Sequence, residues 1–305
     1  MADLRRPALH FSTPAPLVLV HGLTPQGKDD PELRRAARLL ARSGFAVAVP
    51  TLPELSRLRL RPEDAEPVVE TVRALLARLD RRQVALVAVS VGAGPALLAA
   101  ADARVADRVS VVVSLGGYAS AVELLRYALT GVYSYGAAAG RLEPNPEGAR
   151  IFLRANLDLI SNPQDRARLA AWLDAPGTAR PQGLSPEGET IAELLETRAP
   201  ERVDPLVRAL PSELQSLLET LSPERALPRL RARLSLIHGE SDPAVPYTES
   251  LRLADAARAA GVRTRLTVVG VVEHVEASPV RRLSARRLRE LAELWAATFD
   301  LFSSP

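Results

Sequence analysis

A serine nucleophile is indicated by the run Ala88-Val89-Ser90-Val91-Gly92, which ends an apolar segment and opens a stretch of small residues. A serine hydroxyl that attacks carbonyl groups has to stand clear of the chain, and a strained turn between a strand and a helix exposes it in this way. The small side chain of Ala88, with Gly92 and Gly94, leaves room for neighbouring backbone in such a turn. The simpler interpretation of Ser90 is a residue that caps a helix N-terminus.

A serine nucleophile needs a general base, and the chain has only four histidines. His10 lies near the N-terminus, and His21 and His238 each end an apolar run as a His-Gly pair. His274 lies in the segment VGVVEHVEA, after the last apolar run. A base there would overhang the carboxyl end of a sheet, so we predict that His274 is the base. The alternative is an ordinary histidine in a surface loop.

The base in turn needs a carboxylate that orients it. The segment HGESDPAVP offers Asp242, directly after another apolar run, with Glu240 as a rival. We favour Asp242 because a turn before Pro243 would aim its short side chain inward, whereas a simple Asp-Pro turn or a helix cap is the plainer interpretation. The chain order Ser90, Asp242, His274 matches one hydrolase class and differs from the orders in chymotrypsin-like and subtilisin-like enzymes.

An oxyanion hole is expected from two backbone N–H groups, because such donors stabilise the charge of a tetrahedral intermediate. One donor would be Val91, directly after the nucleophile, and the other Leu23, in the loop after the run PLVLVHG. Thr24 and Tyr118 are candidate substrate contacts. Four tyrosines near one another in sequence either line the substrate pocket or form a core: Tyr118, Tyr127, Tyr133 and Tyr135.

The elements that position these residues are short, nearly all-apolar runs that alternate with longer amphipathic segments. Such runs are typical of strands covered on both faces. The alternation predicts an α/β fold with a mostly parallel central sheet and helices on both faces, and ligands then bind at the carboxyl ends of the strands. The predicted strands are 16–22, 45–50, 83–90, 108–117, 233–239 and 263–270, with 8–11 as a further edge strand. The predicted helices are 31–43, 64–80, 91–101, 247–260 and about 280–302.

Residues 119–228 interrupt this alternation with several helical patterns and no convincing strand. We therefore predict a core of residues 1–118 and 229–305 and a helical cap insertion of residues 119–228 over the strand ends. The alternative is a helical domain that has no part in the site. Residues 119–228 are called the insertion below.

The composition is that of an ordinary globular protein, with 47% hydrophobic and 25% charged residues and a net charge of +3. The basic residues are interleaved with acidic ones, so no nucleic-acid surface is expected. No cofactor or metal motif is present, and neither a signal peptide nor an apolar run of membrane-spanning length appears, so we expect a cytoplasmic protein that does not bind membranes. The sequence indicates no oligomeric state. Many prolines and arginines, with no cysteine and one methionine, fit either a thermophile or a GC-rich genome.

The chain resembles the α/β-hydrolase superfamily through VLVHGLTPQGKDD, VALVAVSVGAGPALLAA, LIHGESDPAVP and VEHV. It looks most similar to the serine esterase and dienelactone-hydrolase-like branches. The resemblance implies a small-molecule ester as substrate and hydrolysis through an acyl-enzyme, with attack by Ser90, proton transfer by His274 and orientation by Asp242. Ala88 departs from the usual glycine of the motif, and the cysteine nucleophile of dienelactone hydrolases is absent. Amidase, peptidase or acyltransferase activity with the same triad, or a non-catalytic binding role, are the alternatives.

Overall fold

The computed structural model describes residues 14–143, 146–175, 177–270, 272–273 and 276–277. Its centre is a six-stranded sheet in the order β2-β1-β3-β4-β7-β8, and every neighbouring pair in it is parallel. The predicted fold class is therefore confirmed. The strands are β1 (Ala15–Val20), β2 (Phe45–Ala48), β3 (Val84–Val89), β4 (Val109–Leu115), β7 (Arg233–Gly239) and β8 (Thr264–Val269).

Successive residues of the central strands alternate between two buried clusters, which explains why these strands are apolar throughout. In β3, Leu86 and Ala88 belong to the larger cluster, and Ala85 and Val87 belong to the cluster on the other face. Helices α3, α4 and α11 contribute to the first cluster, and α1 contributes to the second. The core helices are α1 (Pro31–Arg42), α2 (Pro53–Ser56), α3 (Ala65–Leu79), α4 (Ala93–Ala100) and α11 (Thr248–Ala259).

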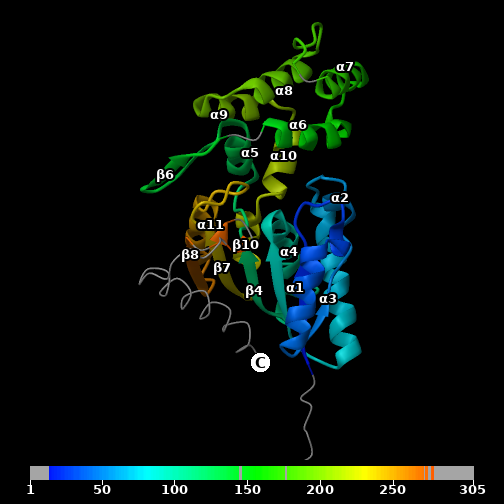
Figure 1. Cartoon of the computed structure of the whole chain (residues 1–305), viewed down its shortest axis with the longest axis vertical. Helices are drawn as coiled ribbons and strands as arrows, with labels where there is room; N and C mark the ends of the chain where they lie inside the picture. The colour runs from blue at the N-terminus through cyan, green and yellow to red at the C-terminus, as the bar shows by residue number, and fades with distance from the viewer. Residues whose placement is uncertain (1–13, 144–145, 176, 271, 274–275, 278–305) are drawn as a thin grey trace, which may run out of the picture.

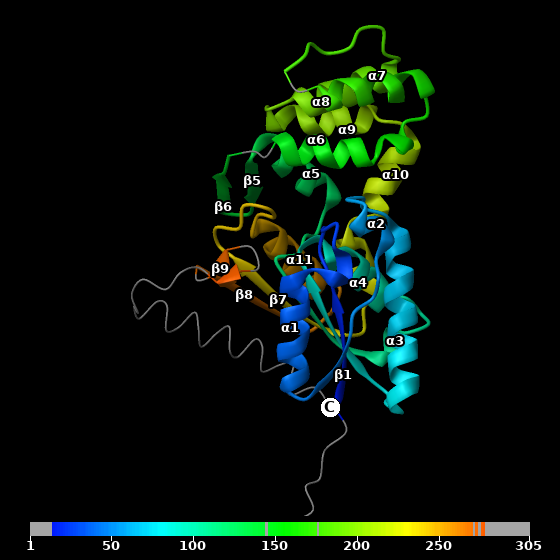
Figure 2. The ribbon, with the colours of Figure 1, turned by 45° about the vertical axis from the view of Figure 1, so that its right-hand side comes forward.

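The insertion lies beyond the end of the sheet at which the parallel strands finish (Figure 1 and Figure 2). It has an apolar cluster of its own, in which Leu169 and Val203 are fully buried. Its helices are α5 (Ala121–Thr130), α6 (Pro146–Ala155), α7 (Pro163–Asp174), α8 (Pro186–Glu196), α9 (Pro200–Ala209) and α10 (Ser212–Thr220).

The insertion also contains an antiparallel hairpin of β5 (Val132–Tyr135) and β6 (Ala138–Arg141). The expectation that the insertion contains no strand is therefore wrong here. The hairpin turns at Gly136, whose positive φ of 57° suits glycine. Two-residue strands β9 (Val272–Glu273) and β10 (Glu276–Ala277) form a second small pair.

Short 3₁₀ helices complete the described structure, at Gly27–Asp29, Pro62–Asp64, Ser90–Gly92, Ala106–Arg108, Leu157–Leu159 and Pro223–Arg229. The predicted edge strand 8–11, the predicted helix 280–302 and His274 all lie outside the described residues. None of the described helices combines the length and the apolar character that crossing a bilayer requires.

The chain enters and leaves the insertion at one place. The N–H of Glu224 donates to the carbonyl oxygen of Ala119 at 3.2 Å, and the N–H of Ala121 donates to Oγ of Ser222 at 3.0 Å. Tyr118 strengthens this junction, since its hydroxyl donates to the carbonyl oxygen of Leu221 at 2.8 Å. The two connections between core and insertion are thus tied to each other.

Candidate active site

Ser90 lies in a strained turn at the carboxyl end of β3. Its φ is +54°, in the left-handed region that non-glycine residues rarely adopt, and a 3₁₀ turn followed by α4 begins there. The residue is only 9% exposed, so its hydroxyl does not lie on an open surface. An ordinary helix-capping serine has extended backbone angles, so this conformation agrees with the predicted nucleophile turn.

Glycines around Ser90 allow two backbone segments to approach each other closely. A Cβ atom on Gly92 would lie 2.2 Å from the carbonyl oxygen of His21, so no other residue fits there without displacement. A Cβ atom on Gly22 would lie 3.2 Å from Cβ of Ser90 and 3.8 Å from its Oγ. The loop after β1 therefore passes directly beside the Ser90 hydroxyl, and it is this loop that carries Leu23, the second predicted oxyanion donor.

His21 fixes the start of that loop and is not available as a base. Its ring is buried, Nδ1 lies 2.8 Å from the carbonyl oxygen of Gly22, and Nε2 accepts from the N–H of Leu52 at 3.4 Å. Burial lowers the pKa of His21, which favours the neutral ring that this pairing requires. Thr24, the candidate substrate contact, is half-buried three residues after His21, and its hydroxyl donates to the Gln26 amide oxygen at 2.6 Å.

Asp242 follows β7 and is 1% exposed, whereas the rival Glu240 is exposed. Oδ1 of Asp242 accepts hydrogen bonds from the N–H groups of Ala244 at 2.8 Å and Val245 at 3.0 Å. This turn, which the Asp-Pro pair begins, directs the carboxylate into the protein. Asp242 therefore has the inward orientation expected from its sequence, at the same edge of the sheet as Ser90.

His238 holds the loop that carries Asp242, a role that the sequence interpretation missed. Its Nε2 lies 2.8 Å from the carbonyl oxygen of Val245 and 3.5 Å from Oδ2 of Asp242, and its Nδ1 lies 2.6 Å from Oγ of Ser250. With both nitrogens held in this way, the ring braces the acid loop rather than facing substrate. The signal in the sequence for such a role is the pair His-Gly, which occurs at the end of two strands. Both histidines are buried, and both ring nitrogens of each contact neighbouring polar groups.

Tyrosines of the insertion contact the acid loop from above. Tyr127, on α5, donates to the carbonyl oxygen of Pro243 at 3.0 Å, and Tyr133 lies edge-on between Tyr127 and Tyr247 with centroid distances of 6.0 Å to each. Burial, with a smaller contribution from the charge of Asp242, raises the pKa of Tyr127 to about 12, so its hydroxyl keeps its proton. Tyr118, by contrast, is a buried core residue, and it is not among the side chains that line the large cavity described next.

A cavity of about 280 Å³ lies between the insertion and the core. The side chains of Val91 and Leu23, the two predicted oxyanion residues, line it. The cavity therefore begins beside the nucleophile and extends into the insertion. Within the described ranges, no group of three His, Asp or Glu side chains is arranged to hold a metal ion.

The model of a protein family described as the alpha/beta hydrolase family matches residues 17–285. A comparison with curated proteins found no match. Among solved structures, the chain is similar to a putative hydrolase from Legionella pneumophila, with a TM-score of 0.56 and 13% identity, over 94% of this chain and 79% of that one.

The chain is also similar to an esterase from Pyrococcus furiosus, with a TM-score of 0.51 and 11% identity, over 97% of this chain and 84% of that one. An acylaminoacyl peptidase from Pyrococcus horikoshii gives a TM-score of 0.50 at 16% identity. That alignment covers 94% of this chain but only 37% of the peptidase, so the chain spans little more than a third of that relative's length. At such identities these structures share the fold.

Proposed function

The chain belongs to the α/β-hydrolase family, and on that basis we propose that it is a serine hydrolase that cleaves carboxylic esters through an acyl-enzyme. The observation that carries the proposal is the conformation of Ser90, whose positive φ and following helix α4 present its hydroxyl at the carboxyl end of β3. Proteins hold such strain mainly at functional sites.

In the proposed reaction Oγ of Ser90 attacks the ester carbonyl carbon. His274 takes the hydroxyl proton and then gives it to the leaving alkoxide as the carbon–oxygen bond breaks, while Asp242 orients His274. A water molecule then attacks the acyl-enzyme by the same proton transfers, which releases the acid and restores Ser90. The N–H groups of Val91 and Leu23 would stabilise the oxyanion, each by about 3 kcal/mol as measured for such donors elsewhere.

An ester suits the neighbouring cavity better than a peptide does. A peptide carries amide groups that need hydrogen-bond partners when they are buried. The cavity beside Val91 is lined almost wholly by apolar side chains and would bury such groups at a cost. We therefore place ester hydrolysis ahead of amide hydrolysis, with acyl transfer to an alcohol as a variant of the same chemistry.

The test combines a fluorophosphonate label with hydrolysis of p-nitrophenyl butanoate. We expect labelling and turnover in the wild type, neither in Ser90→Ala, and a fall in kcat of about 10⁴-fold in Asp242→Asn, the loss seen when a triad aspartate is neutralised elsewhere. Glu240→Gln is the matched control because Glu240 is the exposed carboxylate two residues earlier, and it should retain the wild-type rate. Labelling without ester turnover would redirect the proposal to amides, and the absence of both would refute it.

A further inference from the structure

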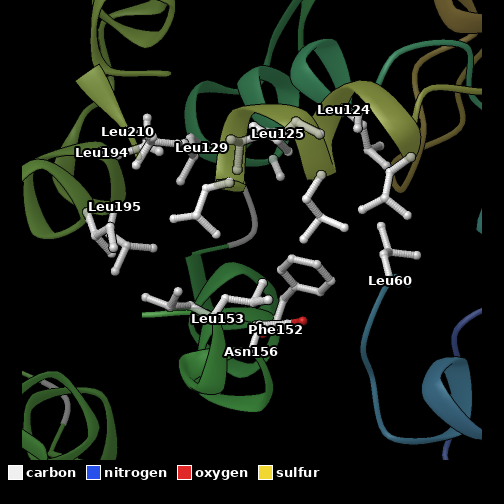
Figure 3. A pocket seen from close by; sticks show the side chains of 18 of the residues that line it. Leu60, Leu124, Leu125, Leu129, Phe152, Leu153, Asn156, Leu194, Leu195 and Leu210 are labelled. Carbon is white, nitrogen blue, oxygen red and sulfur yellow. Dashed lines mark hydrogen bonds between the residues drawn. The ribbon is translucent and has the colours of Figure 1, made fainter. Parts of the chain in front are cut away.

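We propose that the cavity between insertion and core binds the acyl chain of the substrate, and that the chain is unbranched, aliphatic and of medium length. This inference rests on the proposed ester hydrolysis at Ser90. Figure 3 shows the cavity with Leu60, from the core, at one end and Leu194 and Leu195, from α8, at the other. A long shape of this kind accepts an extended chain.

The chemistry of the lining selects an aliphatic group. Of the 22 residues that line the cavity, 20 are apolar, and only Phe152 is aromatic. Aliphatic side chains provide many weak contacts without directional preference, whereas aromatic ligands gain from ring partners placed at suitable angles. The lining therefore favours a saturated chain over an aromatic acyl group.

The two polar lining residues are already engaged. Nη1 of Arg61 donates to Oδ1 of Asn156 at 2.5 Å and to the carbonyl oxygen of Leu60 at 2.9 Å, and Nδ2 of Asn156 donates to the carbonyl oxygen of Phe152 at 2.6 Å. Asp158 also pairs with the Arg61 guanidinium at 3.3 Å. A hydroxyl or amide on the bound chain would thus be buried at a cost, and polar acyl groups should be poor substrates.

The position of the cavity assigns it to the acyl side of the ester. Its core residues follow three strands on one side of the sheet: Leu60 follows β2, Leu23 follows β1 and Val91 follows β3. The acid Asp242 follows β7, beyond β4 on the other side. The leaving alkoxide has to lie beside the histidine that protonates it, and that histidine has to contact the acid. The alcohol therefore leaves on the β7 side, and the group in the cavity is the one that stays bonded to Ser90.

The volume sets the length of the chain. A water molecule occupies about 30 Å³ in the liquid, and a methylene group is of similar size, so 280 Å³ holds roughly nine chain atoms. With the carbonyl carbon outside the cavity, this corresponds to an acyl group of about ten carbons. Each methylene that enters apolar surroundings should raise kcat/KM about fourfold until the cavity is full.

The test compares p-nitrophenyl esters from acetate to hexadecanoate with the wild-type protein, after titration of active sites with the fluorophosphonate. We expect kcat/KM to rise with each methylene up to about decanoate and then level or fall. The benzoate and 6-hydroxyhexanoate esters should react more slowly than the hexanoate ester. A labelled enzyme that shows no gain beyond butanoate would overturn the acyl-chain assignment while leaving the serine chemistry intact.

A substitution in the cavity lining tests whether the acyl chain of the substrate lies in the cavity. Ala128, on α5, lines the cavity near its far end, since Ala128, Leu129 and Leu195 all border a second hollow inside the insertion as well. Ala128→Leu adds three carbons to the lining and should shift the preferred acyl length down by about three carbons. Ala167→Leu, on the exposed face of α7, is the matched control and should keep the wild-type profile. An unchanged profile in both Ala128→Leu and Leu194→Phe, whose position borders the first cavity and not the second hollow, would overturn the assignment.

Calorimetric measurement of fatty-acid binding tests the cavity assignment independently of the proposed ester hydrolysis. Free decanoate should bind the wild type and Ser90→Ala more tightly than butanoate does, and Ala128→Leu should weaken decanoate binding at least tenfold. If the fluorophosphonate fails to label Ser90 but decanoate binds in this pattern, the cavity assignment stands and ester hydrolysis fails. If labelling succeeds and decanoate binds no better than butanoate, the cavity assignment fails.

Discussion

The hydroxyl of Tyr127 and the carboxylate of Asp242 hold opposite ends of one peptide group. Tyr127 donates to the carbonyl oxygen of Pro243 at 3.0 Å, and the N–H of the same Pro243–Ala244 peptide donates to Oδ1 of Asp242 at 2.8 Å. Because a peptide group is planar, fixing its oxygen also fixes the direction of its N–H. A helix of the insertion thereby positions the predicted acid of the core.

Tyr127→Phe should therefore lower kcat more than it changes KM. We expect a fall of about three- to tenfold, since the loss of one hydrogen bond of about 1 kcal/mol loosens the acid loop without removing the acid. The measurement is steady-state kinetics with p-nitrophenyl butanoate across pH. Tyr133→Phe removes a hydroxyl from the same ring cluster and should keep the wild-type kcat; equal losses in both variants would contradict the positioning role.

The strain at Ser90 gives a prediction about stability. Left-handed backbone costs a non-glycine residue about 1–2 kcal/mol, and glycine largely escapes this cost. Ser90→Gly should therefore unfold with a free energy about 1 kcal/mol higher than Ser90→Ala, although both lack the hydroxyl. Urea denaturation of the two variants measures the difference. A Ser90→Gly variant that is less stable than Ser90→Ala would show that the turn is not strained.

The close approach at Gly92 predicts a severe effect of a single methyl group. Gly92→Ala would place Cβ against the His21 carbonyl oxygen, so we expect a loss of about 3 kcal/mol in stability and loss of fluorophosphonate labelling. Gly22→Ala should fold almost normally, because its nearest contacts of 3.1–3.2 Å require only small shifts, yet lose activity as the methyl group crowds Ser90. Thermal melts and labelling together distinguish the two effects.

Glu249 gives a prediction about pH. This carboxylate is 1% exposed, and its Oε2 accepts from the N–H groups of Ala119 and Ser120, at the entry to the insertion, at 3.0 and 2.9 Å. Arg252 pairs with its Oε1 at 3.3 Å, and Glu123 lies beyond that guanidinium. Burial nevertheless raises the pKa of Glu249 above 4.5.

A carboxyl group with a raised pKa binds more protons in the folded state than in the unfolded state. Its contribution to the free energy of unfolding is therefore full below pH 4.5 and falls as the pH rises towards its pKa in the folded state. Glu249→Gln keeps an oxygen acceptor for the two N–H groups and should flatten this part of the pH profile. Denaturant melts between pH 4.5 and 8 measure the slope, with the exposed Glu70→Gln as control. An unchanged slope would show that Glu249 titrates normally.

The sequence predicted the core sheet and its helices well, because both carry strong periodic signals. The predicted helix 31–43, for example, forms as α1, and Asp30 accepts from the N–H groups of Glu32 and Leu33 as an N-cap should. The hairpin β5–β6 was not predicted because its strands are four residues long and partly exposed, and because β6 consists of Ala, Gly and Arg. Such strands show neither clear alternation nor strong β-propensity.

The candidate site was predictable where one local pattern determines the geometry. The turn at Ser90 and the inward direction of Asp242 depend on residues within a few positions of each. The cavity and the contact between Tyr127 and Pro243 depend on how the insertion packs on the core. An apolar stripe on α5 or α8 looks the same in sequence whether it packs against a neighbour or lines a hollow, so these features required the structure.

The tied junction at Ala119 and Glu224 makes the insertion an exchangeable module. Chain ends that meet through a backbone hydrogen bond can be joined by a short turn or by another folded segment without moving β4 or β7. Such an exchange would remove the hydrogen bond that the Tyr127 hydroxyl donates to the acid loop at Pro243. A graft that restores a hydroxyl donor to Pro243 should therefore place a different cavity over an unchanged core sheet and acid loop.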